Sequence, residues 1–167
     1  GEIGVEFENL LKRENIRNYL LAGAGLTVGD VDGNGLPDLF LVSQDGANKL
    51  FKQMAPWEFV DATAASWILE TNSWGAGAAF VDLDNDEDLD LFLCNKGSLD
   101  EVYLNQGGGR FVGTFYGAGD TTHRAPTMVA ASDYDRDGDL DLYRTETRMF
   151  GLHEMFGPKL QTVKDEF

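Results

Sequence analysis

Several residue types on which common protein chemistries depend are scarce in this sequence. A single cysteine, Cys94, excludes a disulfide within the chain, and its strand-like surroundings favour a small buried residue over a nucleophile. The two histidines, His123 and His153, lie 30 residues apart, which is not a zinc-binding spacing. No H-E-x-x-H, nucleophile-elbow or Ser-His-Asp pattern occurs. The usual sequence signatures of zinc sites and of hydrolytic catalysis are therefore missing.

Basic residues are also few. The chain has 13 Lys and Arg against 29 Asp and Glu, which gives a net charge of −16. This excess of negative charge argues against nucleic acid and anionic membranes as partners, because binding to nucleic acid depends on neutralising phosphate. The longest apolar runs are too short to span a bilayer. With 43% hydrophobic and 11% aromatic residues, the chain can nevertheless bury a core.

The acidic residues concentrate in a nine-residue pattern, D-x-D-x-[D/N]-x-x-x-D, that occurs three times. The copies begin at Asp30, Asp82 and Asp133, which are 52 and 51 residues apart. Carboxylates this close repel one another, and a hard divalent cation removes that cost. Calcium takes about 6–8 oxygens from carboxylates, amides and backbone carbonyls. Three acidic surface turns without metal are the alternative, but the fixed interval and the matching flanks favour three calcium sites.

Each site is expected to use the side chains of positions 1, 3, 5 and 9 and the backbone carbonyl of position 7. The predicted ligands are Asp30, Asp32, Asn34, Leu36 and Asp38 at site one; Asp82, Asp84, Asp86, Asp88 and Asp90 at site two; and Asp133, Asp135, Asp137, Asp139 and Asp141 at site three. Site one has three carboxylates where the others have four, so we expect it to bind calcium most weakly. Position 6 is Gly35 and Gly138 in the outer copies, and glycine readily adopts the positive φ of a tight loop. Glu87 at this position predicts a strained or differently shaped middle loop.

An EF-hand is the obvious rival, because its loop also carries oxygens at positions 1, 3 and 5. It needs a bidentate Glu at position 12, where this chain has Leu41, Leu93 and Arg144. Short apolar runs flank each loop, such as 78–81 before the second loop and 91–94 after it. Such runs on both sides of a turn are typical of a β-hairpin rather than of paired helices.

The repetition extends beyond the loops to units of about 50 residues. Each unit reads as four short strands, and repeated four-stranded antiparallel units are typical of β-propeller blades. We therefore predict an all-β chain of about three blades, part of a larger ring or of an open or oligomeric array. The predicted strands are 25–29, 38–43, 49–53 and 58–62 in the first unit; 77–81, 90–94, 101–105 and 110–115 in the second; and 126–132 and 140–144 in the third, with 152–156 and 160–164 as weaker candidates for its third and fourth strands.

The opening segment falls out of phase with the first unit. A shift of 52 residues places Phe7 on Phe59, which lies in the outermost predicted strand of the first unit. Residues 5–10 are therefore predicted to be the outer strand of another blade, whose other strands do not come from residues 25–53. The chain then divides into four regions: residues 1–24 with this strand and a connector, repeat one at 25–68, repeat two at 69–120, and repeat three at 121–167 with an irregular outer half.

The stretch from Gly25 to Phe40, GLTVGDVDGNGLPDLF, resembles the FG-GAP-type repeat of integrin α-subunit propellers. It is more similar still to the bacterial FG-GAP-like (VCBS-type) proteins, including the group with an ASPIC/UnbV domain, as are VYLNQG at 102–107 and FVDAT at 59–63. The resemblance covers roughly residues 5–145. It implies a seven-bladed propeller with calcium in the hairpin between the two inner strands of a blade. Three units cannot close such a ring, so further blades would come from more chain or from other chains, or the sheets would form an open array.

Three functions follow from this reading. A non-enzymatic, calcium-binding, extracytoplasmic module for protein or glycan binding or adhesion is favoured, placed outside the cell, on its surface or in the periplasm. Extracellular modules bind calcium with Kd values of about 10⁻⁴–10⁻³ M, which suits that location. A self-assembling, fibre-forming surface protein is the first alternative, because incomplete blade sets expose strand edges that pair with other copies. A propeller-based polysaccharide-active enzyme is the second, with Trp57, Trp67, Trp74 and Tyr116 as candidate sugar contacts.

Overall fold

The computed structural model describes residues 3–9, 24–68, 74–116, 126–138, 140–146 and 159–163. Eleven strands in these residues form three separate antiparallel sheets. The first sheet contains β1 (Leu26–Gly29), β2 (Asp38–Leu41), β3 (Lys49–Ala55) and β4 (Glu58–Asp61). The second contains β5 (Trp74–Val81), β6 (Asp90–Lys96), β7 (Asp100–Asn105) and β8 (Phe111–Tyr116). The third contains β9 (Pro126–Ser132), β10 (Asp141–Glu146) and β11 (Lys159–Val163).

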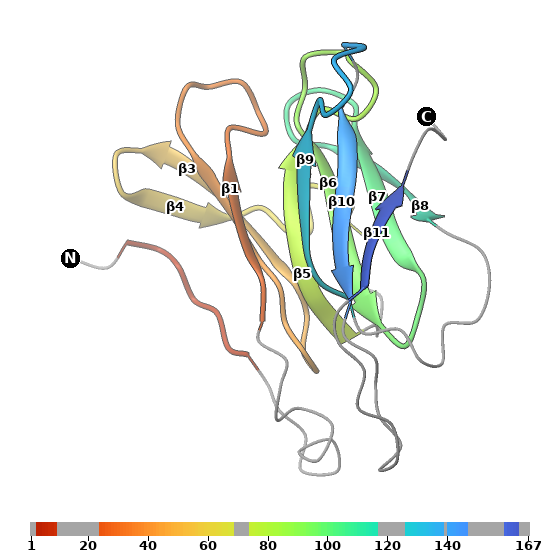
Figure 1. Cartoon of the computed structure of the whole chain (residues 1–167). Coiled ribbons are helices and arrows are strands. Elements are labelled where there is room, and N and C mark those ends of the chain that lie inside the picture. The colour runs from red at the N-terminus through yellow and green to blue at the C-terminus, as the bar shows by residue number, and fades with distance from the viewer. Residues whose placement is uncertain are drawn as a thin grey trace.

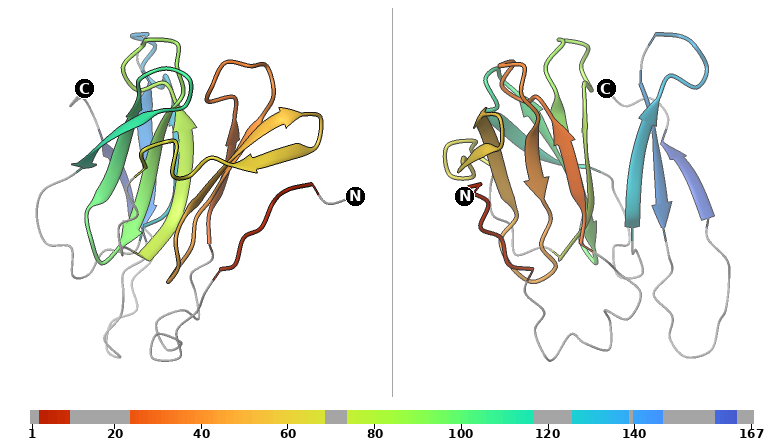
Figure 2. Two further views of the ribbon diagram at one scale, coloured as in Figure 1. Left: turned by 180° about the vertical axis from the view of Figure 1, so that it is seen from behind. Right: turned by 90° about the vertical axis from the view of Figure 1, so that its left-hand side faces the viewer.

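The predicted all-β architecture of four-stranded antiparallel blades is confirmed. Each sheet runs in chain order from an inner strand outward, and neighbouring strands are joined antiparallel. The three sheets stand side by side with β1, β5 and β9 next to one another (Figures 1 and 2). The described residues close no ring. Within them, no helix has the length and apolar character needed to cross a membrane.

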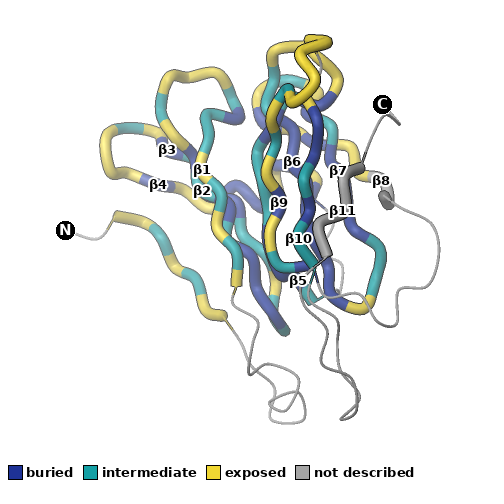
Figure 3. Tube along the Cα trace, in the orientation of Figure 1, coloured by how far each residue is buried: buried dark blue, intermediate teal, exposed yellow. Residues whose placement is uncertain are grey.

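The core lies in two layers, one on each face of the middle sheet. Along β6, Leu91 and Leu93 pack toward the first sheet, against Phe40 and Leu50 among others. The alternate residues Phe92 and Cys94 pack toward the third sheet, against Val129 and Leu142 among others. Successive residues of a strand point to opposite faces, so both faces of β6 are covered and the whole strand is buried (Figure 3). Cys94 is fully buried in this layer, and burial raises the pKa of its thiol.

Glycine lets the inner strands approach one another closely. A Cβ atom on Gly25 would lie 2.7 Å from the Cα of Gly77, and one on Gly77 would lie 2.9 Å from the carbonyl oxygen of Thr127. Real Cβ atoms essentially never come this close to backbone atoms. The glycines just before β1 and in β5 therefore permit the contact between neighbouring sheets.

The third unit departs from the predicted strand order. Residues 160–164 were expected to form a fourth strand, but β11 at 159–163 pairs directly with β10, from Leu142 opposite Val163 to Glu146 opposite Lys159. It therefore occupies the third position of its sheet, after a longer connection than the ones that join β2 to β3 and β6 to β7. The candidate strand at 152–156 lies outside the described residues.

The opening segment was expected to form a strand over 5–10, but residues 3–9 carry no strand in this structure. The carbonyl of Ile3 accepts a 2.9 Å hydrogen bond from the N–H of Phe59. The side chain of Asn9 donates to the side-chain oxygen of Gln44 and accepts from the backbone N–H of the same residue. The segment therefore lies against the first sheet without a continuous ladder (Figure 1). Its place in another blade remains a prediction, as do the four region boundaries.

Candidate metal centres

The three acidic loops connect the two inner strands of each sheet. Residues 30–37 join β1 to β2, residues 82–89 join β5 to β6, and residues 133–140 join β9 to β10. The flanking strands pair directly across each loop, as Gly29 does with Asp38 and Val81 with Asp90. The three sheets stand side by side in the same orientation, so all three loops lie at the same end of the molecule (Figure 1).

Each loop brings carboxylates together. One oxygen from each of three Asp side chains lies within 4.8 Å of the others in every loop. The groups are Asp30, Asp32 and Asp38 in loop one; Asp82, Asp84 and Asp86 in loop two; and Asp133, Asp135 and Asp141 in loop three. Nine of the predicted ligands are thus gathered in threes around a common point in their own loop.

The Asp at position 9 fastens each loop to its sheet. Asp38 is fully buried, and its two carboxylate oxygens accept hydrogen bonds from the N–H of Val31 at 3.0 Å and of Gln53 at 2.8 Å. Asp90 repeats this arrangement with Leu83 at 2.8 Å and Asn105 at 2.7 Å. Burial raises the pKa of both carboxyls, and neighbouring loop carboxylates add to that effect, although the N–H bonds oppose it. In loop three, Asp141 accepts the corresponding bond from the N–H of Tyr134 at 2.9 Å.

The Asp at position 1 and the residue at position 5 shape the turn. Asp30 accepts hydrogen bonds from the N–H groups of Asn34 and Gly35, at 3.1 and 2.7 Å. Asp82 makes the equivalent bonds to Asp86 and Glu87, at 3.2 and 3.1 Å. The side chains at position 5 accept a bond from the N–H two residues on, which involves Leu36 at 2.8 Å and Asp88 at 2.9 Å. These Asx-type turns curl the loop so that alternate side chains face inward. Asp139 lies outside the described residues.

All three loops have positive φ angles at positions 4 and 6. The values are 73° and 84° at Gly33 and Gly35, 60° and 74° at Asn85 and Glu87, and 63° and 102° at Arg136 and Gly138. The sequence predicted that the middle loop is either strained or differently shaped, and the prediction of a different shape is wrong. The loop keeps the common shape and places Glu87 in the left-handed region, where a side chain is disfavoured by about 1–2 kcal/mol.

The donor set suits a hard cation. Every clustered ligand atom is a carboxylate oxygen, which is the donor type of calcium and magnesium rather than of zinc or copper. Oδ1 of Asp133 is buried and has no hydrogen-bond partner among the described residues. Partial desolvation and the charges of Asp86 and Asp82 raise the pKa of Asp84. Both observations are typical of an oxygen cage whose repulsion a cation would relieve, so the clusters can bind a metal ion.

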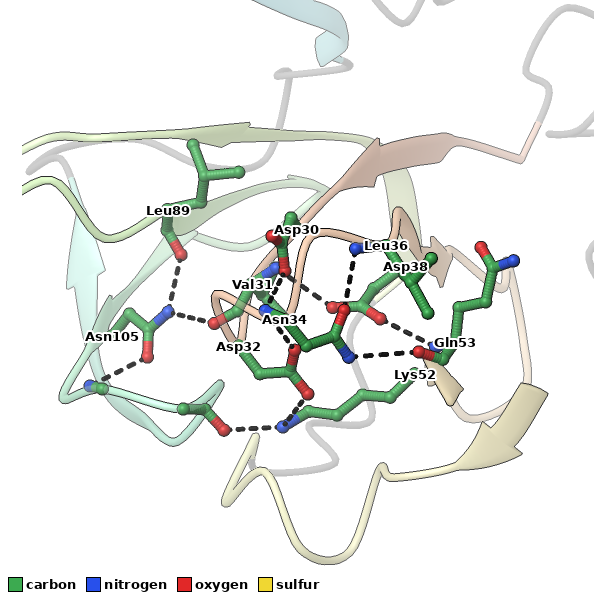
Figure 4. A network of polar contacts seen from close by, with 12 residues as sticks. Asp30, Val31, Asp32, Asn34, Leu36, Asp38, Lys52, Gln53, Leu89 and Asn105 are labelled. Atoms are coloured by element: carbon green, nitrogen blue, oxygen red, sulfur yellow. Dashed lines mark hydrogen bonds and ion pairs between the residues drawn. The ribbon is translucent and has the colours of Figure 1, made fainter. Parts of the chain in front are cut away.

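Two residues near loop one were not anticipated from the sequence. The side-chain amide of Asn105 donates to the carbonyls of Val31 in loop one, at 2.8 Å, and of Leu89 in loop two, at 3.1 Å. The Lys52 ammonium lies 3.5 Å from a carboxylate oxygen of Asp32 (Figure 4). A signal for Asn105 was available, because an amide residue recurs 52 positions apart, at Gln53 and Asn105.

The aromatic residues proposed as sugar contacts lie in separate settings. Trp57, 73% exposed, occupies the turn between β3 and β4. The Trp67 ring lies below the guanidinium of Arg110, at 5.7 Å, and the Trp74 ring below the ammonium of Lys96, at 3.8 Å. The side chain of Tyr116 is outside the described part of the structure. Two of the three described tryptophans thus lie against the cation of a basic side chain.

Comparison with known proteins agrees with the repeated architecture. A family model described as an FG-GAP-like repeat matches residues 30–93 and again residues 82–143. Cartilage acidic protein 1 of Mus musculus is 28% identical over 125 residues, which cover 73% of this chain and 19% of that protein. The Homo sapiens protein of the same name is 27% identical over 124 residues, and the Xenopus tropicalis protein is 24% identical over 129 residues. The chain spans about a fifth of the length of these relatives.

Proposed function

The chain belongs to the FG-GAP-like repeat family, and on this premise we propose that it is a calcium-stabilised, extracytoplasmic propeller module that binds a protein or glycan. The observation that carries the proposal is the recurrence of one oxygen cluster in three loops at the same end of adjacent sheets. Calcium is preferred to magnesium because it accepts irregular cages of about 6–8 oxygens, whereas magnesium demands a near-ideal octahedron.

Calcium would act here mainly on the fold. With a net charge of −16 and three inward-facing carboxylate clusters, the metal-free chain carries strong self-repulsion. The proposed ligands are the residues of positions 1, 3, 5 and 9 in each loop, together with the carbonyls of position 7. Bound metal would hold the inner hairpins in one conformation and keep neighbouring sheets in register, because ligand binding to the folded state adds to its stability.

The test compares metal removal with charge screening. Thermal unfolding would be followed in calcium, in chelator, and in chelator with sodium chloride at matched ionic strength. Salt screens exposed charge, but only a chelated ion satisfies inward carboxylates, so calcium should raise Tm far more than salt does. Isothermal titration should give up to three calcium sites and much weaker magnesium binding. Equal Tm in calcium and in chelator would contradict the proposal.

A binding role is proposed rather than a catalytic one, because the clustered carboxylates are accounted for by the metal loops. The extracellular or periplasmic location rests on the millimolar calcium that such loops require. Binding to glycan and protein arrays, measured in calcium and again in chelator, tests the ligand class. Calcium-dependent capture of a defined glycan or protein is the expected outcome.

Self-association through blades is a second candidate, supported by exposed apolar side chains on both outward-facing sheets. Leu26 and Val28 on β1 are 57% and 53% exposed, and Met128 on β9 is 58% exposed. In the middle sheet, both faces are covered by the sheets on either side. Sedimentation over a range of concentrations would show oligomers or filaments if copies of the chain pack against one another.

A further inference from the structure

Lys52 reaches from the first sheet to two different partners. It lies on β3, and its ammonium is 3.5 Å from Oδ2 of Asp32 and 2.6 Å from the carbonyl oxygen of Gly108 (Figure 4). The Lys52 and Asp32 side chains are only 15% and 16% exposed. Gly108 belongs to the glycine turn 107–109 of the second sheet, so the ammonium is held between a loop-one ligand and a neighbouring blade.

The second sheet has no such charge at the equivalent position. Lys52 pairs with Val60 across β3 and β4, and Leu104 pairs with Val112 across β7 and β8. Both pairs are shifted by 52 residues, so Leu104 occupies the structural position of Lys52 in the next blade. Loop one also carries Asn34 where loop two carries Asp86. Loop two also has Glu87 and Asp88 where loop one has Gly35 and Leu36. The two loops therefore share one backbone shape but differ by four units of charge, three within the loop and one at Lys52.

A fixed ammonium and a bound cation compete for the same carboxylate. The ammonium partly neutralises Asp32, which reduces the repulsion that a metal ion would otherwise relieve. Once a divalent ion is bound to Asp32, the ammonium repels it across a distance of a few ångströms. This repulsion is only partly screened, because both side chains are largely covered.

From this arrangement we propose that Lys52 sets the metal affinity of loop one, as a resident counter-ion that a divalent cation must displace from Asp32. The inference rests on the proposed calcium binding and concerns the regulation of that site. The Gly108 carbonyl is the partner that retains the ammonium after displacement. Loop two consequently binds calcium at lower concentrations than loop one, which fills only at higher calcium concentrations.

The experiment is calcium titration by calorimetry on the full chain and on four variants. Lys52→Met removes the charge and keeps most of the length, whereas Lys52→Arg keeps the charge. Lys49→Met is the matched control, because Lys49 lies on the same strand as Lys52 but its ammonium pairs with Asp61 on β4 instead of with a loop carboxylate. Asp32→Asn identifies the binding signal of loop one. Thermal unfolding in chelator checks that each variant is folded, and Lys52→Gln replaces Lys52→Met if the latter is not.

At low salt, Lys52→Met should tighten calcium binding at the Asp32-dependent site by about tenfold. Lys52→Arg and Lys49→Met should leave that affinity unchanged. The gain should shrink at high salt, which a purely structural role for Lys52 would not produce. If the wild type binds calcium but Lys52→Met does not change the Asp32-dependent site, the inference is wrong while the proposed function stands. If the wild type binds no calcium, the proposed function itself fails.

Discussion

The side-chain amide of Asn105 donates a 2.8 Å hydrogen bond to the backbone carbonyl of Val31, 74 residues earlier in the chain. The same amide donates to the carbonyl of Leu89 at 3.1 Å, and its own oxygen accepts from the N–H of Gly107 at 3.1 Å. Asn105 and Val31 are both fully buried, so the amide and the Val31 carbonyl have no water as an alternative partner. One side chain therefore connects the acidic loops of two adjacent blades.

Replacing Asn105 with Ala should destabilise the chain strongly. The carbonyls of Val31 and Leu89 would lose a buried donor, at a cost of about 2–4 kcal/mol in the free energy of unfolding. Urea denaturation measures the change. Gln106→Ala, at the adjacent exposed position, is the control and should have little effect. A loss no larger than that of the control would show that the two loops do not depend on Asn105.

Replacing Glu87 with Gly should stabilise the chain. Glu87 holds a φ of 74° at the position where the other loops have glycine, and relieving that strain should gain about 1 kcal/mol after the entropy cost of glycine. Glu87→Ala removes the same charge but retains a Cβ atom, so the difference between the two variants isolates the backbone effect. Urea unfolding at one calcium concentration provides the comparison, and equal stability of the two variants would contradict it.

The metal-free chain should become more stable as the pH falls from neutral toward the raised pKa values. The pKa values of Asp38, Asp90 and Asp84 are raised in the folded state. The folded state therefore binds protons more tightly than the unfolded one, and stability is lost as the pH rises through this window. Calcium should reverse the slope, because the metal binds the deprotonated carboxylates.

Asp84→Asn tests this behaviour at one residue. At neutral pH it should raise Tm in the metal-free protein and lower it in calcium. Asp61→Asn is the opposite case, because the hydrogen bond from Lys49 lowers the pKa of Asp61 although partial burial acts against it. That variant should lower Tm with or without calcium. A lower Tm for Asp84→Asn in both conditions would argue against repulsion in loop two.

The ion pair between Arg144 and Asp100 should bind the second and third sheets to each other. The two side chains are 5% and 2% exposed, and Arg144 also pairs with Glu146 on its own strand. Arg144→Met would leave the Asp100 charge buried without its partner, at a cost of about 3–5 kcal/mol. Burial already raises the pKa of Asp100, so this loss should shrink at acidic pH.

The double variant Arg144→Met with Asp100→Asn should recover much of the stability lost in the single variant, since no buried charge remains. Urea unfolding of the wild type, both single variants and the double variant gives the coupling energy. Additive losses would show that the two side chains act independently.

Repetition made the first two blades predictable from the sequence. Their eight strands lie within a few residues of the predicted ranges, because the same apolar alternation and the same acidic turn occur twice at one interval. In the third blade, the repeated sequence pattern does not continue beyond β10. Only a tertiary contact, the pairing of Leu142 with Val163, shows that 159–163 takes the third position.

The acidic clusters followed from the local pattern, but their surroundings did not. The turn that gathers Asp30, Asp32 and Asp38 is encoded within nine residues. By contrast, Lys52 and Asn105 act on loop one from 20 and 74 residues away in the chain, as counted from Asp32 and Val31. The contact of Asn105 depends on how neighbouring sheets pack, and that of Lys52 depends on how β3 folds back beside the loop of its own sheet. The nine-residue pattern specifies neither.

The close approach of Gly25 to Gly77, and of Gly77 to Thr127, fixes how sharply one sheet turns away from the next. Sheets that nearly touch at their inner strands diverge toward their outer strands. A larger side chain at either glycine would increase the distance between the inner strands and reduce the angle between neighbouring sheets. In any assembly that closes into a ring, the two glycines therefore help to determine how many sheets the ring contains.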